Sequence, residues 1–221
     1  MAKRIAIIIS YLIILFVLPI AVAVLFYVLE QRGILPHVKN KQLLLLTNYI
    51  VYSVLPITML IFLHKELINN IKNAGNVINW LIPMILIVYA MAVLGGIFIQ
   101  MIDHTATTQN QIAINEFQNK NLMFTIYMTV IAAPIAEEST FRYAFLHDVK
   151  GGLKYLLLLV SSSAFSLIHL QQNLSVGAFT AYFLIGITLG LIYIKYDNLF
   201  FNIMVHGGYN ALGLVLSIVN N

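Results

Sequence analysis

The chain alternates long apolar stretches with short polar breaks along its whole length. An apolar stretch of about 20 residues is long enough to cross the hydrocarbon core of a bilayer as a helix. Seven such stretches run at about 5–29, 43–63, 78–102, 121–146, 153–171, 174–195 and 198–219. The last two breaks, at 171–173 and 196–198, are so short that the helices on either side must run antiparallel. The pattern therefore predicts an all-α, polytopic transmembrane helix bundle of about seven spans.

Composition supports the membrane assignment and narrows the partners. Hydrophobic residues make up 61% of the chain and charged residues 9%, whereas a soluble domain carries about 25% charged residues to cover its surface. The net charge of +4 is scattered over the connections, so a nucleic-acid partner is excluded and contact with the headgroups of the lipid bilayer is expected. The absence of cysteine excludes a thiolate nucleophile and Cys-ligated zinc.

Spans and short connections account for almost all of the 221 residues. We therefore predict a single transmembrane domain over 1–221, with N-terminal spans at about 5–102 and a core at about 121–219. The apolar run after Lys3 and Arg4 continues well beyond the 7–15 residues of a signal-peptide core, so we expect the first span to be retained.

The distribution of Lys and Arg predicts which side of the membrane the N-terminus faces. If the N-terminus is cytoplasmic, the inner connections hold Lys3, Arg4, Lys65, Lys72, Lys150, Lys154 and Lys195. The outer connections then hold Arg32, Lys39, Lys41 and Lys120. Cytoplasmic connections carry the excess of basic residues, so we expect an integral protein of the plasma membrane with a cytoplasmic N-terminus.

The first informative polar group inside a span runs from Glu137 to Arg142. On a helix, Glu138 and Arg142 are four residues apart and share a face, so they can form an ion pair. Glu137 lies about 100° around the helix and has no cation at the corresponding position. A buried carboxylate without such a partner suits a general base. The alternative is that both glutamates share Arg142 and tie helices together.

Two later spans each carry a polar pair at helical spacing. Phe165 and His169 are four residues apart, so the ring can support the imidazole, although a lone His in a span also serves as a hydrogen-bond partner between helices. His206 and Asn210 are again four apart, so their donors can point to one spot and suit an oxyanion. The alternative is a polar contact between helices. Because HExxH and GxSxG motifs are missing, neither a zincin site nor a serine hydrolase site is supported.

Taken in order, EExxxR at 137–142, FxxxH at 165–169 and HxxxN at 206–210 resemble the CPBP family. This family includes the CAAX prenyl proteases and bacteriocin-processing or immunity membrane proteins of the Abi type. The resemblance covers about the last 90 residues and implies that the core at 121–219 is catalytic. It implies that Glu137 and His169 activate a water and that His206 and Asn210 stabilise the oxyanion. Supporting or substrate-contacting roles would fall to Glu138, Arg142 and Phe165.

Metal use stays open from the residues alone. Glu137, His169 and His206 could ligate one divalent metal such as zinc and leave a position open. A water activated by a glutamate requires no metal, so the sequence predicts no cofactor with certainty.

The preferred hypothesis is an intramembrane endopeptidase, similar to CAAX proteases, that hydrolyses a peptide bond near the membrane. Its partner would be a membrane-associated peptide or protein substrate. The first alternative is a non-catalytic peptide-binding or bacteriocin-immunity protein of the same fold. The second is a small transporter with a proton relay through Glu137 and His169. The sequence shows no internal repeat, a feature typical of transporters, to support it.

Overall fold

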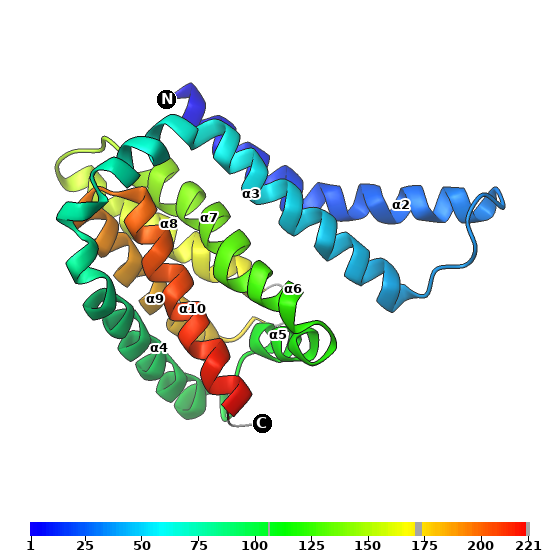
Figure 1. Ribbon diagram of the computed structural model, residues 1–221. Helices are drawn as coiled ribbons and strands as arrows, with labels where there is room; N and C mark the ends of the chain where they lie inside the picture. The colour runs from blue at the N-terminus through cyan, green and yellow to red at the C-terminus, as the bar shows by residue number, and fades with distance from the viewer. Residues whose placement is uncertain (106, 171–173, 220–221) are drawn as a thin grey trace.

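The computed structural model describes residues 1–105, 107–170 and 174–219, and in this part of the chain all regular structure is helical. The helices form a bundle with the N-terminus and the C-terminus at opposite ends (Figure 1). The helix α2 and the first half of α3 project from this bundle as an arm (Figure 1). The all-α fold class predicted from the sequence is confirmed.

The first half of the chain forms α1 (Ala2–Leu12), η1 (Ile13–Val17), α2 (Leu18–Gln31), α3 (Asn40–Lys72), η2 (Ala74–Asn76), η3 (Ile78–Trp80) and α4 (Leu81–Asp103). The second half forms α5 (Gln109–Lys120), α6 (Leu122–Ile126), η4 (Tyr127–Ala132), α7 (Ala133–Glu137), η5 (Glu138–Ala144), α8 (Gly152–Ile168), α9 (Val176–Tyr196) and α10 (Leu199–Val219). Among these, η1, η4 and η5 are π-helical turns, whereas η2 and η3 are 3₁₀ turns.

Several helices are long and apolar enough to cross a membrane, in agreement with the predicted spans. Among the residues that the structure describes, five stretches meet this condition, at Ala2–Gln31, Asn40–Lys72, Ile78–Asp103, Val176–Tyr196 and Leu199–Val219. The predicted span at 121–146 is one helical run, from α6 through η5, in which α and π turns alternate. The predicted span at 153–171 contains α8, a shorter apolar helix of 17 residues. The predicted break at 171–173 lies outside the described residues.

The polar stretch between α4 and α6 contains a helix that the apolar pattern did not predict. Helix α5 has 12 residues, rich in Gln and Asn, and is too short and too polar to be a span. Its start is fixed by Thr108, whose hydroxyl accepts a hydrogen bond from the backbone N–H of Gln111 at 3.1 Å. A cap of this kind sets a helix start without any apolar periodicity, which is why a search for apolar stretches passed over it.

Proline explains the first interruption of the run from α6 to η5. Pro134 has no backbone N–H, so it cannot close the ordinary bond to the carbonyl of Val130. The π turns of η4 lie directly before it. Single π segments widen a helix, and they occur frequently at functional sites. The second π segment, η5, carries Glu138 and Arg142.

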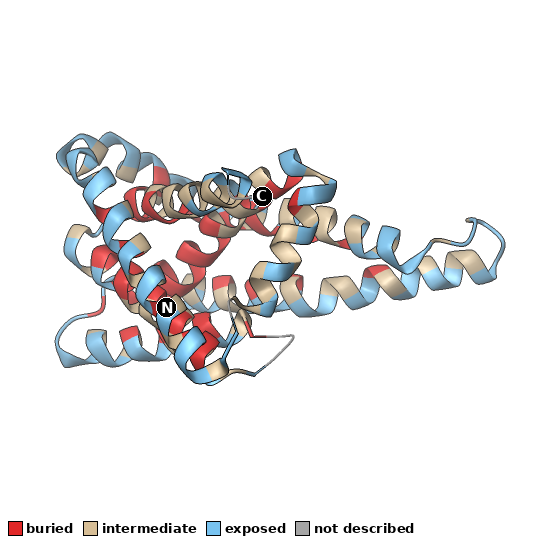
Figure 2. Ribbon diagram, turned by 90° about the horizontal axis from the view of Figure 1, so that it is seen from below, coloured by how far each residue is buried: buried red, intermediate tan, exposed pale blue. Residues whose placement is uncertain are grey.

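Small residues bring α4 and α9 into close contact. A Cβ atom added to Gly95 would lie 2.7 Å from both Cα and Cβ of Ala181, which is closer than van der Waals contact permits. At the end of the same interface, Asp103 accepts hydrogen bonds from the hydroxyl of Ser175 and, at 3.2 Å, from the N–H of Gly177. Buried residues gather where the helices face each other, and the arm of α2 and α3 is mostly exposed (Figure 2). Close backbone approach is a general means of holding helices together where apolar burial alone cannot.

Gly95 and Gly96 offer a matched test of this packing. We expect Gly95→Ala to destabilise the protein by about 1–3 kcal/mol, because its methyl group overlaps Ala181. Gly96 has no atom within 4 Å of an added Cβ, so Gly96→Ala is expected to leave stability unchanged or slightly raised. Thermal unfolding in detergent measures both, and equal melting temperatures for the two variants would contradict the α4–α9 contact.

Candidate active site

Two adjacent glutamates on α7 and η5 have very different surroundings. The side chain of Glu138 is fully buried and surrounded by donors. Its Oε2 lies 3.2 Å from Nε of Arg142 and accepts a hydrogen bond from the amide of Asn202. Its Oε1 lies 2.8 Å from Nδ1 of His206. The charge of Glu138 is therefore balanced by neighbouring side chains, and its ion pair with Arg142 is the one that their spacing predicts.

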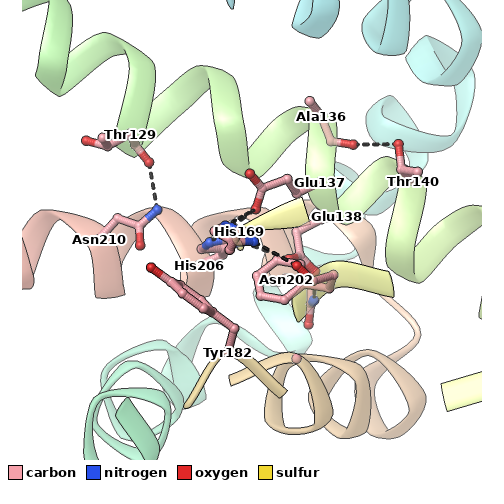
Figure 3. A network of polar contacts seen from close by, with 12 residues as sticks. Thr129, Ala136, Glu137, Glu138, Thr140, His169, Tyr182, Asn202, His206 and Asn210 are labelled. Atoms are coloured by element: carbon pink, nitrogen blue, oxygen red, sulfur yellow. Dashed lines mark hydrogen bonds and ion pairs between the residues drawn. The ribbon is translucent and has the colours of Figure 1, made fainter. Parts of the chain in front are cut away.

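Glu137 instead faces a cavity, and two histidines approach the same oxygen of its carboxylate. Its Oε2 lies 3.9 Å from Nε2 of His206 on α10. The same Oε2 lies 4.0 Å from Nε2 of His169, the residue at which α8 ends. Figure 3 shows the three side chains directed toward one another from three separate elements. The structure thus brings Glu137, His169 and His206 together, although they lie far apart in the sequence.

The other nitrogen of each histidine is already engaged, and this fixes which nitrogen faces Glu137. Nδ1 of His169 lies 2.7 Å from the backbone carbonyl oxygen of Phe165. A carbonyl oxygen can only accept, so Nδ1 of His169 carries the proton. Nδ1 of His206 donates to the Glu138 carboxylate by the same reasoning. In the neutral rings, both Nε2 atoms therefore present lone pairs toward Glu137.

Aromatic side chains hold the first of these histidines. The ring of His169 lies 4.6 Å from that of Phe165 and stacks at 4.5 Å on that of Tyr182. The guanidinium of Arg142 lies 4.8 Å from the centre of the Phe165 ring. Phe165 thus contacts His169 by ring packing as well as through its carbonyl, and its supporting role stays a prediction.

Asn210 lies one helical turn beyond His206 but bonds to a different partner. Its Nδ2 donates to the carbonyl oxygen of Thr129 at 2.8 Å (Figure 3). Thr129 lies five residues before Pro134, and a π turn would pair this carbonyl with the N–H that proline lacks. One amide N–H of Asn210 is therefore engaged by this carbonyl, and the oxyanion role stays a prediction.

Two residues of the site escaped the sequence analysis. Asn202 is fully buried and contacts Glu138. It lies four residues before His206, so extending the HxxxN spacing backwards by one turn would have found it. Tyr182 could not have been found in this way, because nothing in the sequence of α9 distinguishes it from the other aromatic residues there.

A cavity of about 1020 Å³ opens at the site and extends between α3, α5 and α10. The candidate site contributes Glu137, Phe165, His169, Tyr182, His206 and Asn210 to its lining. Helix α8, at about 1.5 Å per residue, is roughly 25 Å long and is shorter than the hydrocarbon core. The helix ends at His169, which lines the cavity.

The donor set itself, one carboxylate and two imidazoles, is of a kind that zinc accepts. Two ligands of a tetrahedral zinc ion lie about 3.3 Å apart, whereas the histidine nitrogens lie 3.9 and 4.0 Å from the carboxylate oxygen. Across residues 1–105, 107–170 and 174–219, no group of three His, Asp or Glu side chains is arranged to hold a metal ion. In this arrangement the three side chains therefore do not fit a metal ion.

The fold and the site together define a class: a transmembrane helix bundle with a carboxylate and two histidines at the end of an internal cavity. Residues 119–212 match the family described as Type II CAAX prenyl endopeptidase Rce1-like. Over these residues the chain is therefore similar to the Rce1-like family, in agreement with the resemblance noted from the three motifs.

Curated relatives come from Lactococcus lactis subsp. lactis (strain IL1403). The chain is 31% identical to UPF0177 protein YvdC over 60% of its own length and 50% of that protein. It is 28% identical to UPF0177 protein YbdI over 63% of its own length and 76% of that protein. The chain thus spans about half the length of YvdC. No solved structure matches the chain.

The neighbouring glutamates allow a matched test of their different surroundings. We expect Glu138→Gln to lower stability by about 3–5 kcal/mol, because it leaves the buried Arg142 without its counter-charge. Every group around Glu138 is a donor, so the new amide N–H₂ meets another donor. Glu137→Gln is expected to keep the melting temperature of the wild type in detergent. A comparable loss of stability in both variants would contradict the assignment of a structural role to Glu138 alone.

Proposed function

We propose that the protein is an intramembrane endopeptidase in which Glu137 and His169 activate a water for attack on a peptide bond. The match to the Rce1-like family supports the class of reaction. The convergence of one carboxylate oxygen and two imidazole nitrogens on one cavity-facing point supports the residue assignment. This convergence is the single observation on which the proposal depends.

The separation of these atoms suits a bridging water. At 3.9 and 4.0 Å they are too far apart for direct hydrogen bonds, but a water about 2.8 Å from each can bridge them. Such a water donates its protons to Glu137 and to one histidine, and its oxygen lone pairs point away toward the cavity. Its oxygen attacks the carbonyl carbon while Glu137 accepts the proton. When the C–N bond breaks, that proton passes to the leaving amine.

The remaining residues act on geometry and charge. His206 is held by Glu138 through Nδ1, so a proton on its Nε2 would point at the developing oxyanion and the ring charge would be stabilised by that carboxylate. Asn210 has a second amide N–H besides the one bonded to Thr129, and we assign it to the same oxyanion. Arg142 and Asn202 keep Glu138 ionised and in place.

Removal of the base tests the mechanism directly. We expect Glu137→Gln and His169→Gln to lower the rate of peptide cleavage by about 10²–10⁴-fold, the range for loss of general-base assistance. The assay uses detergent-purified protein with a panel of prenylated and unprenylated membrane-associated peptides. Glu30→Gln, near the end of α2 and outside the cavity lining, is the matched control and is expected to cleave like the wild type.

The same panel decides between the proposal and its alternatives. Cleavage that persists in Glu137→Gln would overturn the mechanism. Loss of cleavage on addition of a chelator would show that a metal is required, contrary to the geometry of the donor set. If no form cleaves, and Glu137→Gln still protects cells from a bacteriocin, the peptide-binding or immunity alternative is favoured.

Asn210 requires its own test, because it also holds a backbone carbonyl. If it stabilises the oxyanion, Asn210→Ala is expected to lower kcat by about 10²–10³-fold with little change in KM. The melting temperature is measured on the same sample, since the lost bond to Thr129 affects stability alone. A lower melting temperature with an unchanged kcat would assign Asn210 to structure and not to the reaction.

A further inference from the structure

The cavity that starts at Glu137 leads toward one end of the bundle. Beyond the site, its lining comes from the start of α3 (Lys41, Gln42 and Asn48), from α5 and from the last turns of α10 (Gly213 and Leu214). Helix α5 and the C-terminus lie at the end of the bundle away from the N-terminus (Figure 1). The route from the site therefore runs toward the end opposite the N-terminus.

At the end of the bundle that holds the N-terminus, side chains join the helices to one another. Arg4 donates to the carbonyl oxygens of Ala144 and Phe145, at 2.6 and 2.8 Å. Nζ of Lys3 lies 2.5 Å from Oε1 of Glu66, which also accepts from the hydroxyl of Tyr143. These contacts join α1 and α3 to the end of the helical run that carries the site. None of the residues named here lines the cavity.

The charges identify the two ends. Seven Lys and Arg side chains fall in the connections on the N-terminal side, against four on the side of α5. Cytoplasmic connections carry the excess of basic residues, so the mouth of the cavity belongs on the extracytoplasmic face. A substrate that enters by this route arrives from outside the cell.

The rim of the mouth has the chemistry of a peptide-binding surface. Amide side chains gather there from two elements, namely Gln42, Asn48, Gln109, Asn110 and Gln111. Each amide offers both donors and an acceptor, which match the alternating N–H and C=O groups of an extended peptide. The hydroxyl of Tyr182 contacts Thr108 at 2.9 Å and Asn110 at 3.1 Å, while its ring stacks on His169. The rim is therefore joined to the site by a single side chain.

From these observations we propose that the substrate is a peptide that enters from the extracytoplasmic face and binds through the amide rim of α3 and α5. This inference rests on the proposed function for the identity of the site, because the peptide is taken to be what Glu137 and the histidines act on. The direction of entry follows from the cavity and the charges alone.

The natural absence of cysteine makes the direction of entry directly measurable. Gln109→Cys places a thiol on the rim and Leu45→Cys places one further along the lining, whereas Lys150→Cys, outside the cavity, is exposed at the other end. Intact cells are treated with a membrane-impermeant maleimide or a small charged thiosulfonate. We expect labelling at the first two positions, and labelling of Lys150→Cys only after the membrane is permeabilised.

The result does not depend on catalysis, so it separates this inference from the proposed function. Labelling of Lys150→Cys in intact cells, with Gln109→Cys and Leu45→Cys protected until permeabilisation, would overturn it even if the protein cleaves peptides. If Gln109→Cys and Leu45→Cys are labelled from outside but the wild type cleaves no peptide, the direction of entry is supported and the proposed protease activity is contradicted.

The amide rim is tested with the same variants. Attachment of a polymer-linked maleimide to Gln109→Cys is expected to abolish cleavage of whichever peptide of the panel the wild type cleaves, or binding of that panel if none is cleaved. The same treatment of Lys150→Cys is expected to change neither. Equal effects at the two positions would show that peptides do not pass the rim.

Discussion

The burial of one carboxylate, that of Glu138, is the constraint on which the rest of the site depends. A carboxylate removed from water loses several kcal/mol of solvation unless donors replace the solvent. Arg142 supplies a counter-charge from the same helical run, and Asn202 and His206 supply two hydrogen-bond donors from α10. Because these three groups together stabilise the buried charge, they fix the position of α10 relative to the helical run from α6 to η5. His206 is oriented as a consequence, and with it the atom that faces Glu137.

The second constraint is the proline in the same helical run. Pro134 removes a backbone donor, and the π turns of η4 precede it. The chain compensates from α10, where Asn210 donates to Thr129. Gly207 supports the same contact, because a Cβ atom there would lie 2.5 Å from the carbonyl oxygen of Val130. The interruption at Pro134 therefore lies where α10 packs closely against this helical run. Gly207 and Asn210, both within the HxxxN motif, make the contact.

Helix α5 gives the site its access. A bundle of apolar spans would enclose the site completely, whereas a short polar helix at one end provides a wall that water and peptide groups can wet. Its contact with Tyr182 also means that the entrance and His169 share a side chain. Access and chemistry are therefore coupled through one aromatic ring.

The sequence by itself determined the helical class, most of the spans and the pairing of Glu138 with Arg142. Apolar run length and i,i+4 spacing act within one helix, so they can be read without knowing the fold. It also singled out Glu137, His169 and His206, because polar side chains in apolar spans are rare. Only the tertiary structure decided that both histidines face one oxygen of Glu137, that Asn202 completes the shell of Glu138 and that Asn210 bonds to Thr129. These contacts join residues far apart in the chain, and helix packing, which leaves no local periodicity, sets their distances.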